Sequence, residues 1–169
     1  MIDPAGVDEA PLARETPARL AARLAEAKAQ TVAARHPGAY VLGADTVVAC
    51  GRRILPEASD EAAARRCLEL LSGRRHRVYG GLTVIAPDGR KAARLVTTVV
   101  AFKRLEAGEM AAYLRSGEWR GKAGGYAIQG RAAAFVQALN GSYSNVVGLP
   151  LCETSALLHG LGYRPPPEP

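Results

Sequence analysis

The segment Gly43-Ala44-Asp45-Thr46 places a carboxylate and a hydroxyl in the middle of an apolar, β-branched stretch. A carboxylate inside such a stretch costs free energy unless it is paired, hydrogen-bonded or bound to a metal ion. Asp45 is therefore a candidate general base or metal ligand, with the Thr46 hydroxyl beside it. Considered alone, an Asp at a strand end that caps a neighbouring turn explains the same position equally well.

Further residues suit a phosphorylated ligand. Lys122 lies in a Gly-rich loop that is flexible enough for backbone to approach a phosphate, although an ordinary surface turn has the same composition. Gln129, at the tip of a predicted hairpin, offers both a donor and an acceptor. Glu9 is a weaker candidate, because acidic residues near a terminus are ordinarily solvated, and Lys28 lies on the flank of a helical stripe. The stretch 142–145 precedes a predicted helix, whose free N–H groups favour anions, and a plain turn is the alternative.

Other reactive side chains form no recognisable constellation. The three histidines have no metal-ligand spacing, and no Ser-His-Asp or Cys-His set stands out. His76, which lies among arginines, is expected at the surface. The three cysteines are scattered, which is typical of free thiols in a reducing cytosol and predicts a cytoplasmic protein.

Composition limits the class of protein. The 169 residues, 48% apolar and 22% charged, suit one globular domain with its own core. No apolar run approaches the roughly 20 residues that span a bilayer, and the first residues do not resemble a signal peptide. The net charge of +6 suits a phosphorylated small molecule or a nucleic acid. Because only 5% of residues are aromatic, we expect no dedicated nucleic-acid binding. The short apolar runs predict no membrane partner.

The first half of the chain predicts two helices and three strands. Thr16-Pro17 is an N-cap followed by a Pro at the first helical position, and an apolar stripe continues to about residue 35. The apolar run 40–50 predicts a buried strand that carries Asp45. A second helix is expected from residue 59 or 60 to Gly73. Two strands, 77–86 and 93–102, are joined by a Pro-Asp-Gly turn and form a hairpin.

The second half predicts a short helix before Gly117, a Gly- and Lys-rich loop over 118–125, and a second hairpin with arms 126–128 and 132–139. A turn over 140–142 then leads to a last helix over 149–159. The expected fold is a single α/β domain over residues 1–164 with a mixed, partly antiparallel sheet, followed by a Pro-rich tail over 165–169.

Taken in order, these segments resemble the Maf (septum formation) family of nucleoside triphosphate pyrophosphatases. The resemblance extends from about residue 7 to residue 162. The matching blocks are Val7-Asp8-Glu9, Lys28-Ala29, Gly43-Ala44-Asp45-Thr46-Val47-Val48, Leu71-Ser72-Gly73-Arg74-Arg75-His76-Arg77-Val78, Tyr113-Leu114-Arg115-Ser116-Gly117-Glu118, Lys122-Ala123-Gly124-Gly125-Tyr126-Ala127-Ile128-Gln129-Gly130, Gly141-Ser142-Tyr143-Ser144-Asn145-Val146-Val147-Gly148-Leu149-Pro150-Leu151 and Glu153-Thr154.

The resemblance implies hydrolysis of a nucleoside triphosphate to the monophosphate and pyrophosphate with a divalent metal ion, Mg²⁺ or Mn²⁺. It implies a two-lobed, inosine-triphosphatase-like architecture with a central cleft. Asp45 matches the proton acceptor, and with Glu9 it is expected to hold the metal. Thr46 and Gln129 match positions tied to substrate choice, in a pairing that looks like the dTTP/UTP subtype. Lys28 and Lys122 are expected to stabilise charge on the phosphates.

Three features depart from the family's pattern. The usual N-terminal strand with its Ser-Pro-Arg-Arg segment does not occur in this sequence, so an open sheet edge is expected, and a homodimer that covers it is one arrangement that fits. Glu57 stands near the place of a usual Lys, and Gly80 at the place of a usual Thr. The alternative function is a catalytically weakened nucleotide-binding or regulatory paralogue linked to cell-division control.

Overall fold

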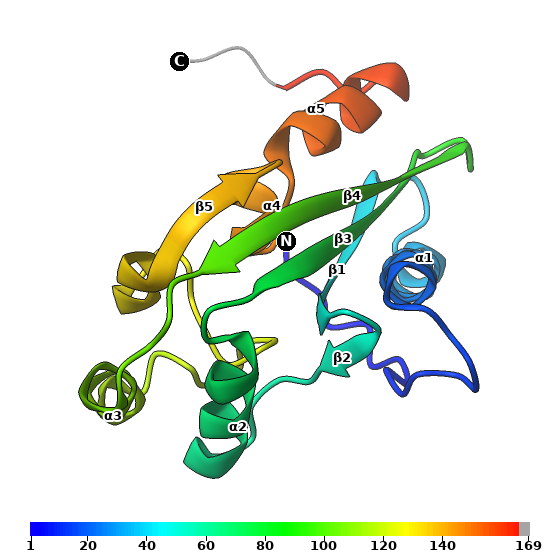
Figure 1. Ribbon diagram of the computed structural model, residues 1–169. Coiled ribbons are helices and arrows are strands. Elements are labelled where there is room, and N and C mark those ends of the chain that lie inside the picture. The colour runs from blue at the N-terminus through cyan, green and yellow to red at the C-terminus, as the bar shows by residue number, and fades with distance from the viewer. Residues whose placement is uncertain (166–169) are drawn as a thin grey trace.

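A five-stranded sheet forms the centre of the computed structural model, which describes residues 1–165; most of the predicted Pro-rich tail lies outside these described residues. The strand order is β2-β1-β3-β4-β5 (Figure 1). Every neighbouring pair among the described strands is antiparallel. The strands are β1 (Val41–Cys50), β2 (Arg53–Leu55), β3 (Arg75–Ile85), β4 (Lys91–Phe102) and β5 (Val136–Asn140). The predicted hairpin of β3 and β4 is confirmed by their continuous register.

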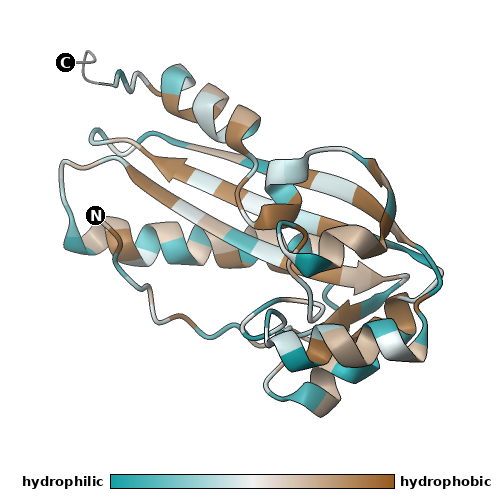
Figure 2. Ribbon diagram, turned by 90° about the vertical axis from the view of Figure 1, so that its left-hand side faces the viewer, coloured by the Kyte–Doolittle hydropathy of each residue, from teal (hydrophilic) through white to brown (hydrophobic). Residues whose placement is uncertain are grey.

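Helices cover both faces of the sheet. Helix α1 (Pro17–Arg35) lies along one face and α5 (Leu151–Gly160) lies on the other, as Figure 2 shows. The predicted N-cap is confirmed, because the Thr16 hydroxyl accepts a hydrogen bond from the Arg19 amide. The α1 face that meets the sheet is built of small, fully buried residues: Ala21, Ala25 and Ala29. No helix among residues 1–165 is both long and apolar enough to cross a bilayer.

A second lobe lies beyond one end of the sheet. Helices α2 (Glu61–Leu71) and α3 (Ala107–Ser116) and the 3-10 helix η1 (Arg131–Phe135) surround its core (Figure 1). That core is aromatic and aliphatic, and its largest fully buried members are Tyr113, Phe102, Leu68, Leu71 and Leu114. One predicted boundary is confirmed in each of α2 and α3: Asp60 caps α2, and α3 ends at Gly117, whose φ of 72° a glycine adopts without strain.

The second predicted hairpin is wrong. Residues 126–128 form no strand, and the other predicted arm, 132–139, divides into η1 and β5. Strand β5 pairs with β4 instead. The run of alanines at the start of that arm is compatible with the helical turn of η1, and the rest of the arm is extended because it pairs with β4, which is distant in the sequence. Gln129 therefore lies in a turn that precedes η1. The short strand β2 and the short helix α4 (Tyr143–Val147) were not predicted.

Candidate active site

Asp45 and Lys28 meet where α1 crosses β1. Asp45 pairs with Gly81 of β3 in register, so its side chain projects from the sheet face that α1 covers. Nζ of Lys28 lies 2.7 Å from Oδ1 of Asp45 and 2.7 Å from Oε1 of Glu9. The carboxylate of Asp45 is 10% exposed, whereas that of Glu9 is 58% exposed. One ammonium thus bridges a buried and an open carboxylate.

Two glycines allow this approach of α1. A Cβ added to Gly43 would stand 2.3 Å from the carbonyl oxygen of Ala25, and one added to Gly81 would stand 2.1 Å from that of Ala21. Real Cβ atoms do not come this close to backbone, so α1 lies nearer to β1 and β3 than any larger residue at these positions would permit. The Lys28 ammonium reaches Asp45 because of this close contact.

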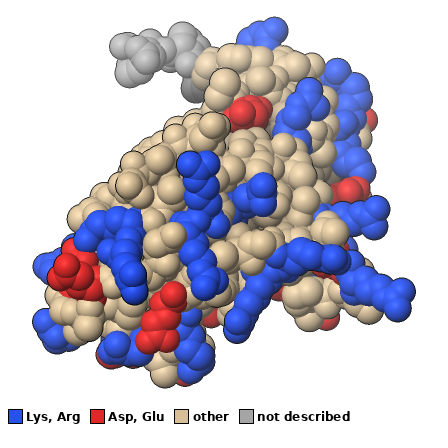
Figure 3. Space-filling model, viewed as in Figure 1, with Lys and Arg blue, Asp and Glu red and all other residues tan. Residues whose placement is uncertain are grey.

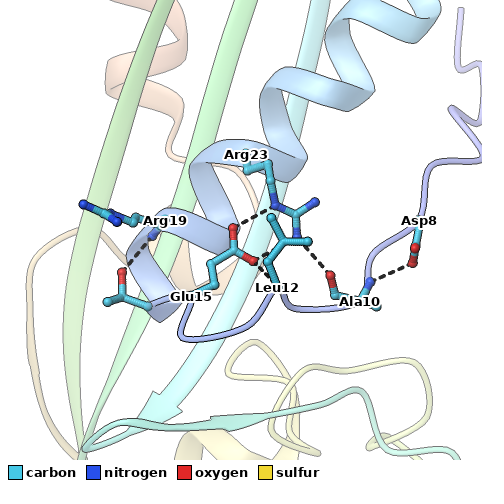
Figure 4. Close-up of polar contacts among 7 residues, drawn as sticks. Asp8, Ala10, Leu12, Glu15, Arg19 and Arg23 are labelled. Atoms are coloured by element: carbon cyan, nitrogen blue, oxygen red, sulfur yellow. Dashed lines mark hydrogen bonds and ion pairs between the residues drawn. The ribbon is translucent and has the colours of Figure 1, made fainter.

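The segment before α1 is fastened to the helix by Arg23. Figure 4 shows the Arg23 guanidinium bound to both carboxylate oxygens of Glu15, at 2.7 and 2.9 Å, and to the Ala10 carbonyl at 3.0 Å. The Leu12 amide also donates to Glu15. A bidentate guanidinium–carboxylate pair fixes direction as well as distance. These contacts hold the irregular segment against α1, where Glu9 reaches Lys28.

Burial and ion pairing oppose each other at this pair. Burial raises the pKa of the Asp45 carboxyl above its ordinary value, although the hydrogen bond from Lys28 lowers it in part. For Lys28 the balance is reversed: burial lowers the pKa of its ammonium, but the hydrogen bonds to Asp45 and Glu9 outweigh that effect and the net pKa is raised. Lys28 therefore stays charged, while Asp45 holds a proton more readily than an exposed Asp.

Thr46 faces the other side of the sheet, opposite to Asp45. It pairs with Gly80, and its hydroxyl donates a long hydrogen bond, 3.4 Å, to the carbonyl of Gly148. Gly148 directly follows α4, so the end of that short helix lies against β1. Residues 146–148 and Thr46 line the same cleft as Asp45. Asp45 and Thr46, which are adjacent in β1, therefore line the same cleft from opposite faces of the strand.

The cleft has a volume of about 610 Å³. All six predicted site residues line it: Glu9, Lys28, Asp45, Thr46, Lys122 and Gln129. Its size is that of a small-molecule site. Lys122 and Gln129 are exposed and approach from the second lobe. Glu57 also lines the cleft, beside Lys122, because Glu57 forms a β-bridge with Ala123. Glu57, which stands near the place of the family's usual Lys, therefore adds a negative charge to the lining of the cleft.

Asp45 and Glu9 are the residues that suit a divalent metal. Residues 1–165 contain no group of three or more His, Cys, Asp or Glu side chains that forms a complete metal cage. Mg²⁺ does not need one, because it keeps several waters and is commonly held by one or two carboxylates together with substrate phosphates. Two carboxylates that converge on one cation, here the Lys28 ammonium, fit that mode of binding.

Two features at or beside the cleft were not predicted from the sequence. His76 was expected at the surface, and that prediction is wrong: it is 2% exposed, and its Nε2 lies 2.7 Å from the hydroxyl of Tyr126, a cleft residue. Alternation along β3 was the available signal, because buried Val78 lies two residues on. The wall made by 146–148 lies between the predicted turn over 140–142 and the predicted last helix over 149–159, and no residue pattern indicated that α4 would meet β1.

The chain matches a known protein family and several curated relatives. The model of the Maf-like protein family matches residues 1–161. A protein of Paramagnetospirillum magneticum named dTTP/UTP pyrophosphatase is 68% identical over 165 residues, which cover 98% of this chain and 87% of the relative. Proteins of the same name from Rhodospirillum rubrum and Caulobacter vibrioides are 65% and 62% identical, and the matches cover 97% of this chain and 78% and 85% of those relatives.

Proposed function

The chain belongs to the Maf-like protein family, and we propose that it hydrolyses dTTP and UTP to the monophosphate and pyrophosphate. The observation that carries this proposal is the buried Asp45 carboxylate in a nucleotide-sized cleft, 2.7 Å from a Lys28 ammonium that stays charged. The names of the relatives favour an enzyme over a non-catalytic regulator.

In the proposed reaction, water attacks the α-phosphorus and the bond to the oxygen that bridges the α- and β-phosphates breaks. Asp45 accepts the proton of the attacking water, and its raised pKa suits a general base because it lies closer to the working pH. A Mg²⁺ or Mn²⁺ ion held by Asp45 and Glu9 would offset phosphate charge and make that water more acidic. The carboxylate of Asp45 is held in place by Lys28 from α1.

Lysines on the two sides of the cleft bind the triphosphate. Lys28 lies beside Asp45 and stabilises charge that develops where the bond breaks, and Lys122 approaches from the second lobe. The surface assists at longer range, since the charged side chains on the face seen in Figure 3 are mainly Lys and Arg. A net charge of +6 attracts a polyanionic substrate before it reaches the cleft.

Thr46 and Gln129 are proposed to bind the pyrimidine. Both line the cleft, Thr46 from β1 and Gln129 from the turn before η1. The amide of Gln129 can donate and accept, which suits the alternating acceptor and donor groups on the edge of thymine or uracil. The hydroxyl of Thr46 is the smaller partner.

The test is pyrophosphate release from dTTP, UTP, CTP and 7-methyl-GTP, with Mg²⁺ or Mn²⁺ and after metal removal by chelation. The proposal expects release from dTTP and UTP that needs the metal. In Asp45→Asn the rate should fall by roughly 10²–10⁴-fold, the usual contribution of a general base, while the circular dichroism spectrum is unchanged. An Asp45→Asn protein that releases pyrophosphate at the rate of the unaltered chain would remove Asp45 from the mechanism.

Two accompanying proposals concern the setting of the enzyme. A cytoplasmic location fits the free thiols of Cys50, Cys67 and Cys152, which a reducing compartment preserves. The homodimer stays a prediction, and sedimentation equilibrium measures it directly.

A further inference from the structure

The side chain of Asn145 is buried completely beneath the cleft wall. Its Nδ2 lies 3.2 Å from the Val78 carbonyl oxygen and 3.0 Å from the Thr98 hydroxyl, so it joins α4 to both β3 and β4. A third acceptor, the Val96 carbonyl, lies at 3.5 Å. A buried amide with these contacts is costly to move, because its Nδ2 group would lose its acceptors away from water.

Gly80 provides the space for the other half of this amide. A Cβ added to Gly80 would stand 1.9 Å from Oδ1 of Asn145. The conflict could be relieved only by turning the Asn145 side chain, which would break the contacts of its Nδ2. Gly80, which stands at the place of the family's usual Thr, therefore leaves the room that the Asn145 side chain occupies.

Asn145 fixes residues that line the cleft. Its backbone amide donates to the Ser142 hydroxyl, and the amide and carbonyl of Ser142 both bond to Thr98, each at 3.1 Å. The three residues that follow, 146–148, form the wall of the cleft. Gly148 ends that wall and accepts from Thr46, which is the β1 neighbour of Gly80. Asn145 and Gly80 thus set the position of the Gly148 carbonyl beside Thr46.

A carbonyl at this place has a chemical consequence for the choice of base. It accepts one hydrogen bond from Thr46 and keeps a second lone pair. Thymine and uracil present an N3–H donor, whereas the N3 of cytosine presents a lone pair and would be repelled by an acceptor. A fixed acceptor therefore favours dTTP and UTP over CTP.

We propose that Asn145, seated on Gly80, is a positioning residue for base recognition: it holds the wall 146–148 so that the Gly148 carbonyl discriminates uracil and thymine from cytosine. The proposal deepens the proposed function and rests on it. Asn145 itself touches neither substrate nor the reacting atoms. Its effect should therefore appear in KM and in the choice of nucleotide more than in kcat.

The experiment is a double-mutant cycle of Asn145→Ala and Gly80→Ala. Activity is measured as kcat and KM for dTTP, UTP and CTP. Each single variant should lower the preference for dTTP and UTP over CTP by roughly tenfold, the factor that corresponds to one hydrogen bond of ordinary net strength. In the Asn145→Ala background, Gly80→Ala should have almost no further effect, because the atom that it would meet is gone. Gly108→Ala is the matched control, since a Cβ there meets nothing within 4 Å.

A general loss of stability would not produce this pattern. It would lower the melting temperature and the amount of active protein without changing the ratio between nucleotides. If Gly80→Ala alone does not fold, the comparison of Asn145→Ala with the double variant still decides the matter, because the proposal expects the second change to be tolerated. Equal effects of Gly80→Ala in both backgrounds, or an unchanged nucleotide ratio in folded Asn145→Ala, would overturn the proposal.

Failure of the proposed function has a different signature. In that case the unaltered chain releases no pyrophosphate from dTTP or UTP. Calorimetric binding of dTTP, UTP and CTP then replaces turnover, and the same cycle is read from the ratio of Kd values. Tighter binding of dTTP and UTP that depends on Asn145 supports the positioning role, and binding without preference overturns it.

Discussion

Gly43 of β1 lies directly beneath Ala25 of α1, so close that a Cβ on Gly43 would stand 2.3 Å from the Ala25 carbonyl oxygen. The contact matters beyond that one position because Lys28 lies one helical turn further along α1, where it reaches Asp45. Helix height above the sheet and the geometry of the ion pair are therefore set by the same contact.

Gly43→Ala should push α1 away from β1. Overfilling a tightly packed contact costs about 1–3 kcal/mol, which should appear as a lower denaturant midpoint with an unchanged slope. Because Lys28 moves with the helix, kcat should fall as well. Gly160→Ala in α5, where an added Cβ meets nothing within 4 Å, serves as the control. A Gly43→Ala protein with full stability would show that α1 is not seated as tightly as this contact requires.

The pH profile should report the state of Asp45. A general base works only when deprotonated, and burial raises the pKa of Asp45 above 3.8. The acid limb of kcat/KM should therefore lie above that value. In Lys28→Gln the limb should move to still higher pH, because the hydrogen bond from Lys28 is what lowers the pKa of Asp45. The measurement is pyrophosphate release over a pH series. An acid limb that Lys28→Gln leaves in place would exclude Asp45 as the titrating group.

Glu57 should weaken the binding of the triphosphate. Two unit charges 4 Å apart interact by about 1 kcal/mol in water, so removing one repulsion in Glu57→Gln should lower KM roughly fivefold. The decrease in KM should become smaller as salt is added, because the Glu57 side chain is exposed and salt screens its charge. Glu69→Gln makes the same charge change on α2 outside the cleft lining and should leave KM unchanged. An equal gain in both variants would point to net charge rather than to the position of Glu57.

His76 should make the fold sensitive to acid. Burial lowers its pKa from 6.5 to about 4, so the unfolded chain takes up a proton in a pH range where the folded chain does not. The free energy of unfolding should therefore decrease as pH falls from about 6.5 to about 4, by an amount on the order of 3 kcal/mol. Subtracting the curve of His76→Phe isolates this contribution. Parallel stability curves for the two proteins would contradict it.

The α/β class and most of the helices were predictable because their signals are local. Thr16-Pro17, Asp60 and Gly117 act within one turn of the chain, and all three mark real boundaries. The failure over 126–139 has the opposite cause. An apolar run of that length is compatible with strand or helix, and the choice was made by the pairing of β5 with β4, which lies far away in the sequence.

The residues that line the candidate site could be predicted one at a time, but their geometry could not. Asp45 was identified because a carboxylate is out of place in an apolar strand, and Glu9 because it matched a block of the family. Their shared partner Lys28 could not be derived from spacing, since it depends on how closely α1 approaches β1. Asn145 was singled out only as part of the stretch 142–145, and nothing in its neighbours indicates that its side chain is buried against β3 and β4.

The hydrogen bond from Thr46 to Gly148 joins residues 102 positions apart in the chain. A contact between residues so far apart in sequence closes a long loop, which lowers the conformational entropy of the chain. Such a contact becomes stable only after pairings between residues closer in sequence have formed. The β3–β4 hairpin can form early, whereas the cleft exists only once α4 has docked. Nucleotide should therefore bind the completed fold alone, and it should slow unfolding and amide exchange throughout the sheet by mass action.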